Sequence, residues 1–361
     1  MKGAVYLLLF FMLRVCGQAQ GPSQSLASRI DGDYHITRFP FQSGDTTLKD
    51  LRLHYTTFGK PTRNTSGKVT NAVLILHGTG SSGQNFINPQ FGGVLFNPGQ
   101  LLDTNKYYLI LPDGIGHGRS SKPSDGLHMR FPHYTYDDMV LAYYRLLTEH
   151  LQVDHLRLLM GTSMGAMHSW IWGYTYPDFM DALLPLASLP VAIAGRNRMM
   201  RKQAIRLIEM DPEWKGGEYT AQPAQGLAGA SSSLFFMNSS AFHLQERAPT
   251  REKADQLLDA MEKNYLSSLD ANDLIYQLDA SRDYDPSPFL KKIKAPLFAI
   301  NSADDQINPP ELGILEREIK KVEKGRYILL PITEKTVGHG TNSLPAVWSD
   351  YLKELLKAPE R

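Results

Sequence analysis

Short apolar runs separated by polar, turn-forming stretches recur along most of this chain. Residues 34–41 and 50–58 alternate apolar and polar side chains, which is typical of antiparallel strands with one solvated face. Later runs are apolar throughout, a pattern that favours strands buried on both faces of a sheet. These runs lie at residues 72–76, 107–111, 156–160, 182–186, 297–301 and 327–330.

Helical spacing of apolar residues occurs between these runs. Residues 136–151 place Met139 and Tyr143 on one face of a helix. Residues 166–174 suit a buried helix, and residues 344–356 suit a closing helix. The alternation of buried strands and helices predicts an α/β fold with a mostly parallel, doubly wound sheet. Sites in such sheets lie at the carboxyl ends of the strands, so side chains there are the first candidates for chemistry.

Residues 195–283 break this alternation with a mostly polar, mostly helical stretch. We expect helices at residues 198–209, 251–264 and 271–280, and a loop at residues 222–229. This stretch is interpreted as a helical cap inserted into the sheet core. The predicted organisation is a signal peptide at residues 1–19, a first core part at 20–194, the cap at 195–283 and a second core part at 284–361.

The N-terminus has the features of a secretory signal peptide. Lys2 precedes an apolar run at residues 4–13, and Gly17-Gln18-Ala19 supplies the small residues of a cleavage site. The run is too short for a comfortable membrane span, although Arg14 leaves an uncleaved anchor as the alternative. We expect an exported protein, periplasmic or secreted, without stable membrane insertion after cleavage. Cleavage would also remove Cys16, the only cysteine, and with it any thiol or disulfide chemistry.

Composition narrows the classes of partner. The chain has 361 residues, of which 42% are apolar and 21% are charged, as in a globular protein. A net charge of +1 gives no electrostatic basis for binding nucleic acid or an anionic membrane. No H-E-x-x-H or clustered His/Asp pattern predicts a metal site, and no cofactor motif is found. The expected partner is a small-molecule acyl or ester substrate.

The run that ends at Met160 leads into Gly161-Thr162-Ser163-Met164-Gly165, a G-x-S-x-G frame. In this frame the serine occupies a strained turn between strand and helix, with its hydroxyl above the sheet edge. Gly161 and Gly165 allow the strand and the helix to pass closely. We therefore expect Ser163 to be a nucleophile, with an ordinary Gly/Ser turn as the alternative.

A nucleophilic serine needs a base and a carboxylate that orients the base. His339 follows the last predicted strand, where a base could reach Ser163. Asp304 and Asp305 are adjacent after another strand, and Asp305 is preferred because it lies four residues before Pro309, the usual spacing in α/β-hydrolases. Asp304 is then expected to cap a turn. The order serine, aspartate, histidine is also that of α/β-hydrolases.

Two backbone N–H groups are expected to form an oxyanion hole. One is that of Met164, at a helix N-terminus, and the other is that of Thr79, two residues after His77. A phosphate cradle is the alternative for residues 77–83, which lack the G-K-[ST] of a P-loop. We expect His77 and His117, in Gly-rich turns, to pack or to stabilise those turns.

Several motifs together resemble one branch of the α/β-hydrolase superfamily, the homoserine O-acetyltransferase-like proteins. The resemblance extends over nearly the whole chain after residue 19 and is most specific in the cap. It implies an acyl-enzyme on Ser163, transfer of the acyl group to a hydroxyl, and a homodimer that forms through the cap. The matching residues are Gly161–Met167, Tyr176-Pro177-Asp178, Gln203-Ala204-Ile205, Asp211–Tyr219 and Pro309-Pro310.

This sequence also departs from that branch. Family acetyltransferases carry an aspartate after the catalytic histidine, which holds the substrate amine, and here this residue is Gly340. Their arginine for the substrate carboxylate lies near the first cap helix, where Arg198, Arg201 and Arg206 are candidates. Because acetyl-CoA is cytosolic, the expected function is an exported serine hydrolase that cleaves an ester. The alternatives are an O-acyltransferase with an unknown acceptor and a non-catalytic binding protein of this fold.

Overall fold

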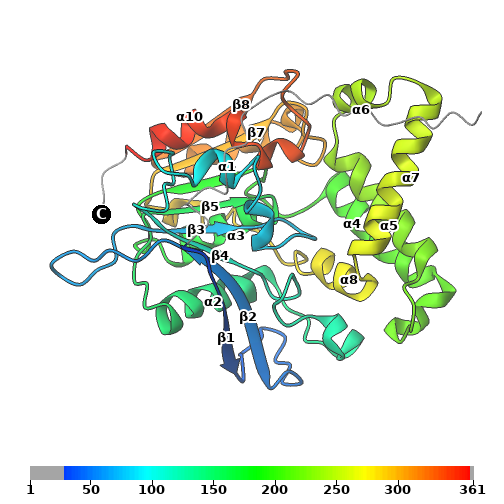
Figure 1. Cartoon of the computed structure of the whole chain (residues 1–361), viewed down its shortest axis with the longest axis horizontal. Coiled ribbons are helices and arrows are strands. Elements are labelled where there is room, and N and C mark those ends of the chain that lie inside the picture. Colours follow the sequence, from blue (N-terminus) through cyan, green and yellow to red (C-terminus); the bar gives the residue numbers. More distant parts are fainter. Residues whose placement is uncertain (1–27, 358–361) are drawn as a thin grey trace, which may run out of the picture.

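The computed structural model describes residues 28–357 (Figure 1), so the predicted signal peptide lies outside the described residues. Within them, eight strands form one sheet in the order β1-β2-β4-β3-β5-β6-β7-β8. The predicted α/β fold is confirmed. The strands are β1 (Ile30–Thr37), β2 (Asp50–Phe58), β3 (Ala72–Leu76), β4 (Tyr108–Pro112), β5 (Leu158–Thr162), β6 (Leu183–Leu186), β7 (Leu297–Ser302) and β8 (Gly325–Leu330).

The sheet is parallel except at one edge. β1 pairs with β2, and β2 with β4, in antiparallel register, as the alternating patterns of the first two strands predict. Every later pair is parallel, with Leu74 of β3 opposite Ile110 of β4 on one side and Leu159 of β5 on the other. All residues of β3 and β5 are buried, which explains their unbroken apolar sequences. The carboxyl ends of β5 and β7 consequently face the same edge of the sheet.

Helices cover both faces of the sheet and bury two apolar clusters. The cluster on one face includes Trp170 and Trp172 of α3, and that on the other includes Trp348 of α10; all three rings are fully buried. α3 runs back along β5 and β6, so its first residue lies at the carboxyl edge. The core helices are α1 (Gly92–Leu95), α2 (Tyr136–Arg145), α3 (Met164–Thr175), α9 (Ile314–Glu318) and α10 (Pro345–Leu355).

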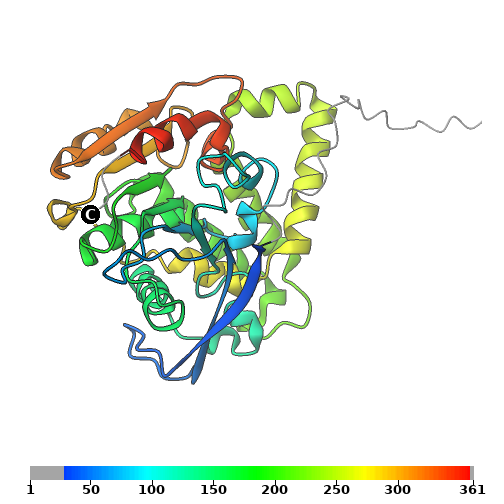
Figure 2. The same ribbon diagram turned by 60° about the vertical axis from the view of Figure 1, so that its left-hand side comes forward.

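Five further helices lie between β6 and β7, within the segment predicted to be a cap. Figures 1 and 2 show these helices, coloured green to yellow, gathered on one side of the sheet, with α8 nearest to it in Figure 1. They bury a third apolar cluster of their own, to which α4, α5 and α8 contribute. The helices are α4 (Gly195–Met210), α5 (Ala224–Asn238), α6 (Ala241–Arg247), α7 (Arg251–Ser268) and α8 (Ala271–Asp279).

The loop expected at residues 222–229 is wrong, because α5 begins at Ala224. Gly226 suggested a loop, but it is a packing residue: a Cβ there would lie 2.5 Å from the Leu207 carbonyl oxygen of α4. Glycine allows two helices to approach closely, a reason that a single sequence does not distinguish from turn formation. The helix expected at residues 136–151 is also shorter, since α2 ends at Arg145 and a π-helical turn follows.

No helix in residues 28–357 is both long and apolar enough to cross a membrane.

Candidate active site

Ser163 lies between β5 and α3 with a backbone φ of 51° and ψ of −110°, a conformation that is unfavourable for a residue with a side chain. The turn is held by close packing. A Cβ on Gly161 would lie 2.2 Å from the Gly165 carbonyl carbon, and one on Gly165 would lie 2.1 Å from the Leu76 oxygen. The Ser163 N–H donates to the Leu186 carbonyl oxygen at 2.9 Å, which ties the turn to β6. Ser163 therefore projects at the carboxyl edge of the sheet.

The structure brings Ser163, His339 and Asp305 together in one hydrogen-bonded chain. His339 Nε2 lies 2.8 Å from Ser163 Oγ, and His339 Nδ1 lies 2.8 Å from Asp305 Oδ2. When Nδ1 carries the imidazole proton and donates a hydrogen bond to the carboxylate, Nε2 is unprotonated and can accept the proton of Ser163. Asp305 and His339 are both buried, so few water molecules compete for these contacts.

Asp305 is held as an anion by its surroundings. Burial alone would raise the pKa of this carboxyl, but His339 and the hydrogen bonds from Asn308 outweigh burial and hold the pKa below its ordinary value. Oδ1 accepts the backbone N–H groups of Ile307 and Asn308 at 2.8 and 3.0 Å, and Oδ2 accepts Asn308 Nδ2 at 3.0 Å. Sequence reasoning missed Asn308; an amide three residues after an aspartate in a turn is the signal that could have indicated it.

Asp304 contacts the loop that carries the histidine rather than the histidine itself. Its Oδ2 accepts the Gly338 N–H at 3.0 Å, and its Oδ1 accepts the Ser302 hydroxyl at 2.5 Å. The two adjacent carboxylates thus face different partners, as expected for a turn. Asp304 therefore holds Gly338, the residue before His339, in addition to the local turn contact that the sequence predicts.

We call residues 77–83 the oxyanion loop, because the sequence predicts one oxyanion donor there. Its Gly78 lies against Ser163, since a Cβ on Gly78 would be 3.4 Å from Ser163 Cβ. His77 Nε2 accepts the Gly114 N–H at 2.9 Å, and Nδ1 consequently donates to the Gly78 carbonyl oxygen at 2.9 Å. In a trans peptide the C=O and N–H point in opposite directions, so this bond turns the Thr79 N–H away from His77. Met164 opens α3, and its N–H has no helical acceptor.

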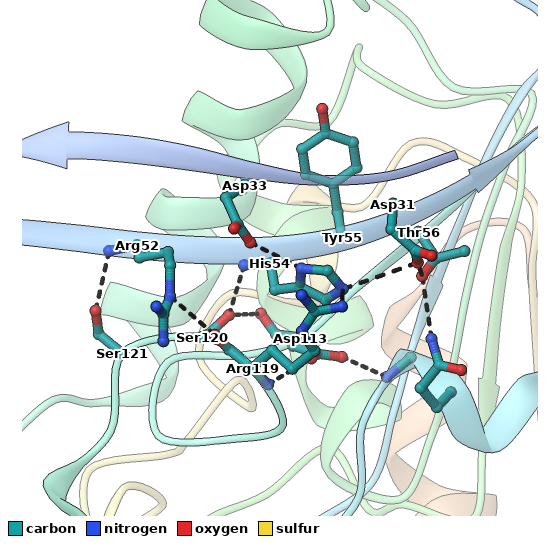
Figure 3. Close-up of polar contacts among 12 residues, drawn as sticks. Asp31, Asp33, Arg52, His54, Tyr55, Thr56, Asp113, Arg119, Ser120 and Ser121 are labelled. Atoms are coloured by element: carbon teal, nitrogen blue, oxygen red, sulfur yellow. Dashed lines mark hydrogen bonds and ion pairs between the residues drawn. The ribbon is translucent and has the colours of Figure 1, made fainter. Parts of the chain in front are cut away.

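A buried network holds the far side of the oxyanion loop (Figure 3). Asp113, which follows β4, accepts the Gly83 N–H with Oδ1 and the Arg119 N–H with Oδ2, both at 2.8 Å. Ser120 Oγ donates to the Asp113 carbonyl oxygen and accepts the His54 N–H. Asp113 thereby fixes the end of the loop, while Gly114 next to it fixes the beginning through His77.

Replacing His77 with phenylalanine is expected to lower kcat about 10²-fold with little change in KM, comparable to the loss of one oxyanion donor. The Gly78 carbonyl would no longer be held, and the buried Gly114 N–H would have no acceptor. The matched control is His117→Phe, a buried histidine 5.0 Å from the His77 ring that donates to Ile115. Steady-state kinetics on a chromogenic acetate ester, with thermal melting of both variants, measures the effect. Equal kcat losses in the two variants would contradict this role for His77.

The other candidate residues have different surroundings. Arg201 is buried and donates to two neutral oxygens, Asn197 Oδ1 and Ser281 Oγ, whereas Arg198 and Arg206 line an exposed groove along α4. His117 packs in a buried turn, as expected. Among residues 28–357, no group of three or more His, Cys, Asp or Glu side chains is arranged to hold a metal ion.

A mostly apolar pocket of about 450 Å³ adjoins the turn that carries Asp305. Met167 lies on the first turn of α3, and Leu189 and Ile193 belong to the segment between β6 and α4. Asn308 separates this pocket from His339, whose Nδ1 lies 3.4 Å from Asn308 Nδ2. The pocket can accommodate an uncharged, apolar part of a substrate.

Residues 71–328 match a family model described as alpha/beta hydrolase fold, and the chain belongs to this family. Within the family its sequence is similar to that of the homoserine O-acetyltransferase-like branch. It is 28% identical over 283 residues to a probable acyltransferase from Methanothermobacter thermautotrophicus, covering 78% of this chain and 85% of the relative. It is 28% identical over 352 residues to a homoserine O-acetyltransferase from Pelobacter propionicus, covering 86% and 92%. It is therefore an enzyme of hydrolase or acyltransferase type.

Two solved structures have the same fold. A homoserine O-acetyltransferase from Bacillus anthracis aligns with a TM-score of 0.79 at 20% identity, over 92% of this chain and 99% of the other. An acetylester hydrolase from Corynebacterium glutamicum aligns with a TM-score of 0.79 at 23% identity, over 91% and 96%. At these identities the likeness establishes the fold alone, and the fold serves both chemistries.

Proposed function

We propose that this chain is an O-acyltransferase that carries an acyl group on Ser163 and delivers it to a hydroxyl acceptor. The observation that carries the proposal is the continuous contact from Ser163 Oγ through His339 to Asp305, at 2.8 Å for each step. Acyl transfer through a serine requires an imidazole whose Nδ1 proton is held by a carboxylate and whose Nε2 can accept the serine proton. The similarity to acyltransferases, over 78% and 86% of this chain, supports the same chemistry.

In the proposed mechanism, Ser163 Oγ attacks the acyl carbonyl as its proton passes to His339 Nε2. The N–H groups of Thr79 and Met164 stabilise the resulting oxyanion, and Asp305 stabilises the imidazolium. His339 returns the proton to the leaving group, and the acyl-enzyme remains. An acceptor hydroxyl then gives its proton to His339 and attacks the acyl carbon, and Ser163 recovers the proton as it leaves.

The acceptor is proposed to differ from homoserine. Gly340 stands where the resembling acetyltransferases carry the carboxylate for the substrate amine, so an ammonium group would have no counter-ion at this position. Arg201 is the arginine of the first cap helix that could bind a substrate carboxylate, because it is buried and the oxygens that it contacts are neutral.

A hydrolase that uses water as the acceptor is the second candidate. Gly340 favours it as well, because without an amine-binding carboxylate nothing at this position gives an amino alcohol an advantage over water.

Export is also part of the proposal, since the features of residues 1–19 are those of a secretory signal. An exported enzyme would take its acyl group from an ester rather than from acetyl-CoA. Intact-mass analysis of the protein from cytoplasmic and extracytoplasmic fractions tests export, and a chain that begins at Met1 and is found only in the cytoplasm would argue against it.

Acyl transfer is tested with p-nitrophenyl acetate as donor and a panel of alcohols, including homoserine, as acceptors. Both the acetylated alcohol and free acetate are measured. We expect acetylated alcohol to form in a Ser163-dependent manner, with homoserine no better than other alcohols. Free acetate without transfer to any alcohol would contradict the acyltransferase and leave the hydrolase. If a fluorophosphonate probe does not label Ser163 and no ester is turned over, the non-catalytic binding protein remains.

A further inference from the structure

A polar pocket of about 260 Å³ lies between the oxyanion loop and helix α8 of the cap segment. Gly80, Ser81 and Ser82 form one wall, and Asp273 and Gln277 of α8 form the opposite wall. Gly80 directly follows Thr79, the proposed oxyanion donor, so the pocket adjoins the reacting centre through one short loop. Figure 1 shows α8 on the side of the cap segment that faces the sheet.

Gln277 lines this pocket and carries a buried hydrogen-bond acceptor. The side chain is only 7% exposed, and its Nε2 donates to the Gly116 carbonyl oxygen at 2.8 Å. Its Oε1 is buried and has no partner among the described residues, and it lies 4.0 Å from the position that a Cβ on Gly80 would take. A buried amide oxygen without a donor is destabilising, and a hydroxyl of a ligand would supply the missing donor.

The remaining polar groups define the charge of the pocket. Asp273 accepts the N–H and the hydroxyl of Ser124 and lies 3.7 Å from Lys122 Nζ. Burial, and next the nearby Asp270 carboxylate, together raise the pKa of Asp273 to about 6. Near neutral pH, two carboxylates and one ammonium line the pocket, which repels anions. A single apolar residue, Leu269, lies among the lining side chains, so a hydrocarbon group would gain little there.

A second polar pocket of about 430 Å³ adjoins the first, and Asp270 lines both. Tyr219 and Gln222, which donate to Asp270, lie on its wall together with Asn272. Hydroxyl, amide and carboxylate groups therefore extend along the N-terminal half of α8. Such a surface suits a ligand that carries several hydroxyl groups, each of which can both donate and accept.

We propose that this pocket binds the alcohol portion of the substrate, and that this portion is a neutral polyhydroxyl group such as a sugar or polyol. One of its hydroxyls donates to Gln277 Oε1, and others pair with Asp270, Asp273 and the serines of the oxyanion loop. This inference rests on the proposed acyl transfer through Ser163. The same site serves whether the alcohol leaves from an ester or accepts an acyl group, because the two steps are the reverse of each other.

The kinetic test uses Gln277→Met, which keeps the side-chain length and removes both the Oε1 acceptor and the Nε2 donor to Gly116. With p-nitrophenyl acetate as donor, methyl glucoside and 1-hexanol are compared as acceptors, and the ratio of acetylated alcohol to free acetate is measured for each. We expect the ratio for methyl glucoside to fall about tenfold, as for loss of one buried hydrogen bond, while that for 1-hexanol keeps its value. The matched control is Gln256→Met, on the exposed face of α7. Equal falls for both alcohols would overturn the proposal, because Gln277 would then act only by positioning the oxyanion loop.

A binding test separates this inference from the proposed function. The ligand methyl glucoside is added to the Ser163→Ala protein, which cannot turn over esters, and binding is measured by saturation-transfer NMR. We expect a signal from methyl glucoside that becomes weaker when Gln277→Met is added to the same protein. Glucose 6-phosphate, which is an anion, is expected to give a weaker signal than methyl glucoside. No signal from methyl glucoside overturns the pocket, whatever the activity. A Gln277-dependent signal in a wild-type protein that turns over no ester would support the pocket and overturn the acyltransferase.

Discussion

Replacing Ser163 with alanine is expected to lower turnover of every ester by about 10³–10⁶-fold, to the limit of detection. The acyl group has no other attachment point in the proposed mechanism, and within residues 28–357 Ser163 is the hydroxyl that His339 Nε2 contacts, at 2.8 Å. The fold should persist, because the Cβ that defines the turn is kept and the Ser163 N–H still reaches the Leu186 oxygen. Steady-state kinetics and thermal melting of the same preparation check the two parts.

Ser169→Ala is the matched control for this experiment. Ser169 lies on α3, the helix that follows Ser163. It is fully buried and donates to the Gly165 carbonyl oxygen at 2.9 Å, without contact to His339. We expect this variant to keep the turnover of the wild type with a small loss of stability, about 0.5–1.5 kcal/mol. Full activity in Ser163→Ala, or an equal loss in both variants, would end the assignment of Ser163 as nucleophile.

The sheet could be predicted from the sequence because burial on both faces leaves a strong local signal. Unbroken apolar runs such as 72–76 occur only where neither face meets water, and β3 has the predicted bounds. Part of the cap segment lacks this signal: α7 leaves most of its residues exposed and buries only Met261, whereas α8 buries nearly all of its residues and has close to the predicted bounds. The start of α5 was missed for a related reason, because Gly226 serves packing against α4.

The candidate site divides in the same way. Ser163, Asp305 and His339 could be predicted because each lies in the turn or loop that follows a strand, namely β5, β7 and β8. Parallel strands bring these connections to one edge of the sheet. Residues that act through a tertiary contact left no sequence signal. Asp113 reaches Gly83 across 30 positions, and Gln277 reaches Gly116 across 161.

The two adjacent aspartates give the sharpest test of the site, because they have the same chemistry and different partners. Asp305→Asn is expected to lower kcat about 10⁴-fold. The amide would donate to His339 Nδ1, which moves the imidazole proton to Nε2 and leaves no acceptor for the proton of Ser163. Asp304→Asn should cost about tenfold or less, since the amide oxygen can still accept the Gly338 N–H. Comparable losses of kcat in the two variants would contradict the assignment of Asp305, and a larger loss in Asp304→Asn would assign its role to Asp304.

The pH dependence of stability gives a second, independent measurement on Asp305→Asn. The pKa of Asp305 lies below its ordinary value in the folded protein, so the folded state binds fewer protons than the unfolded state at mildly acidic pH. Its stabilising contribution is complete above the unfolded pKa of about 3.9 and is lost as the pH falls through the lower folded value. The unfolding free energies of wild type and Asp305→Asn, from urea titrations, should therefore converge below about pH 4. If the difference in unfolding free energy between the two proteins stayed constant at acidic pH, the charge of the Asp305 carboxylate would not be what His339 and Asn308 stabilise.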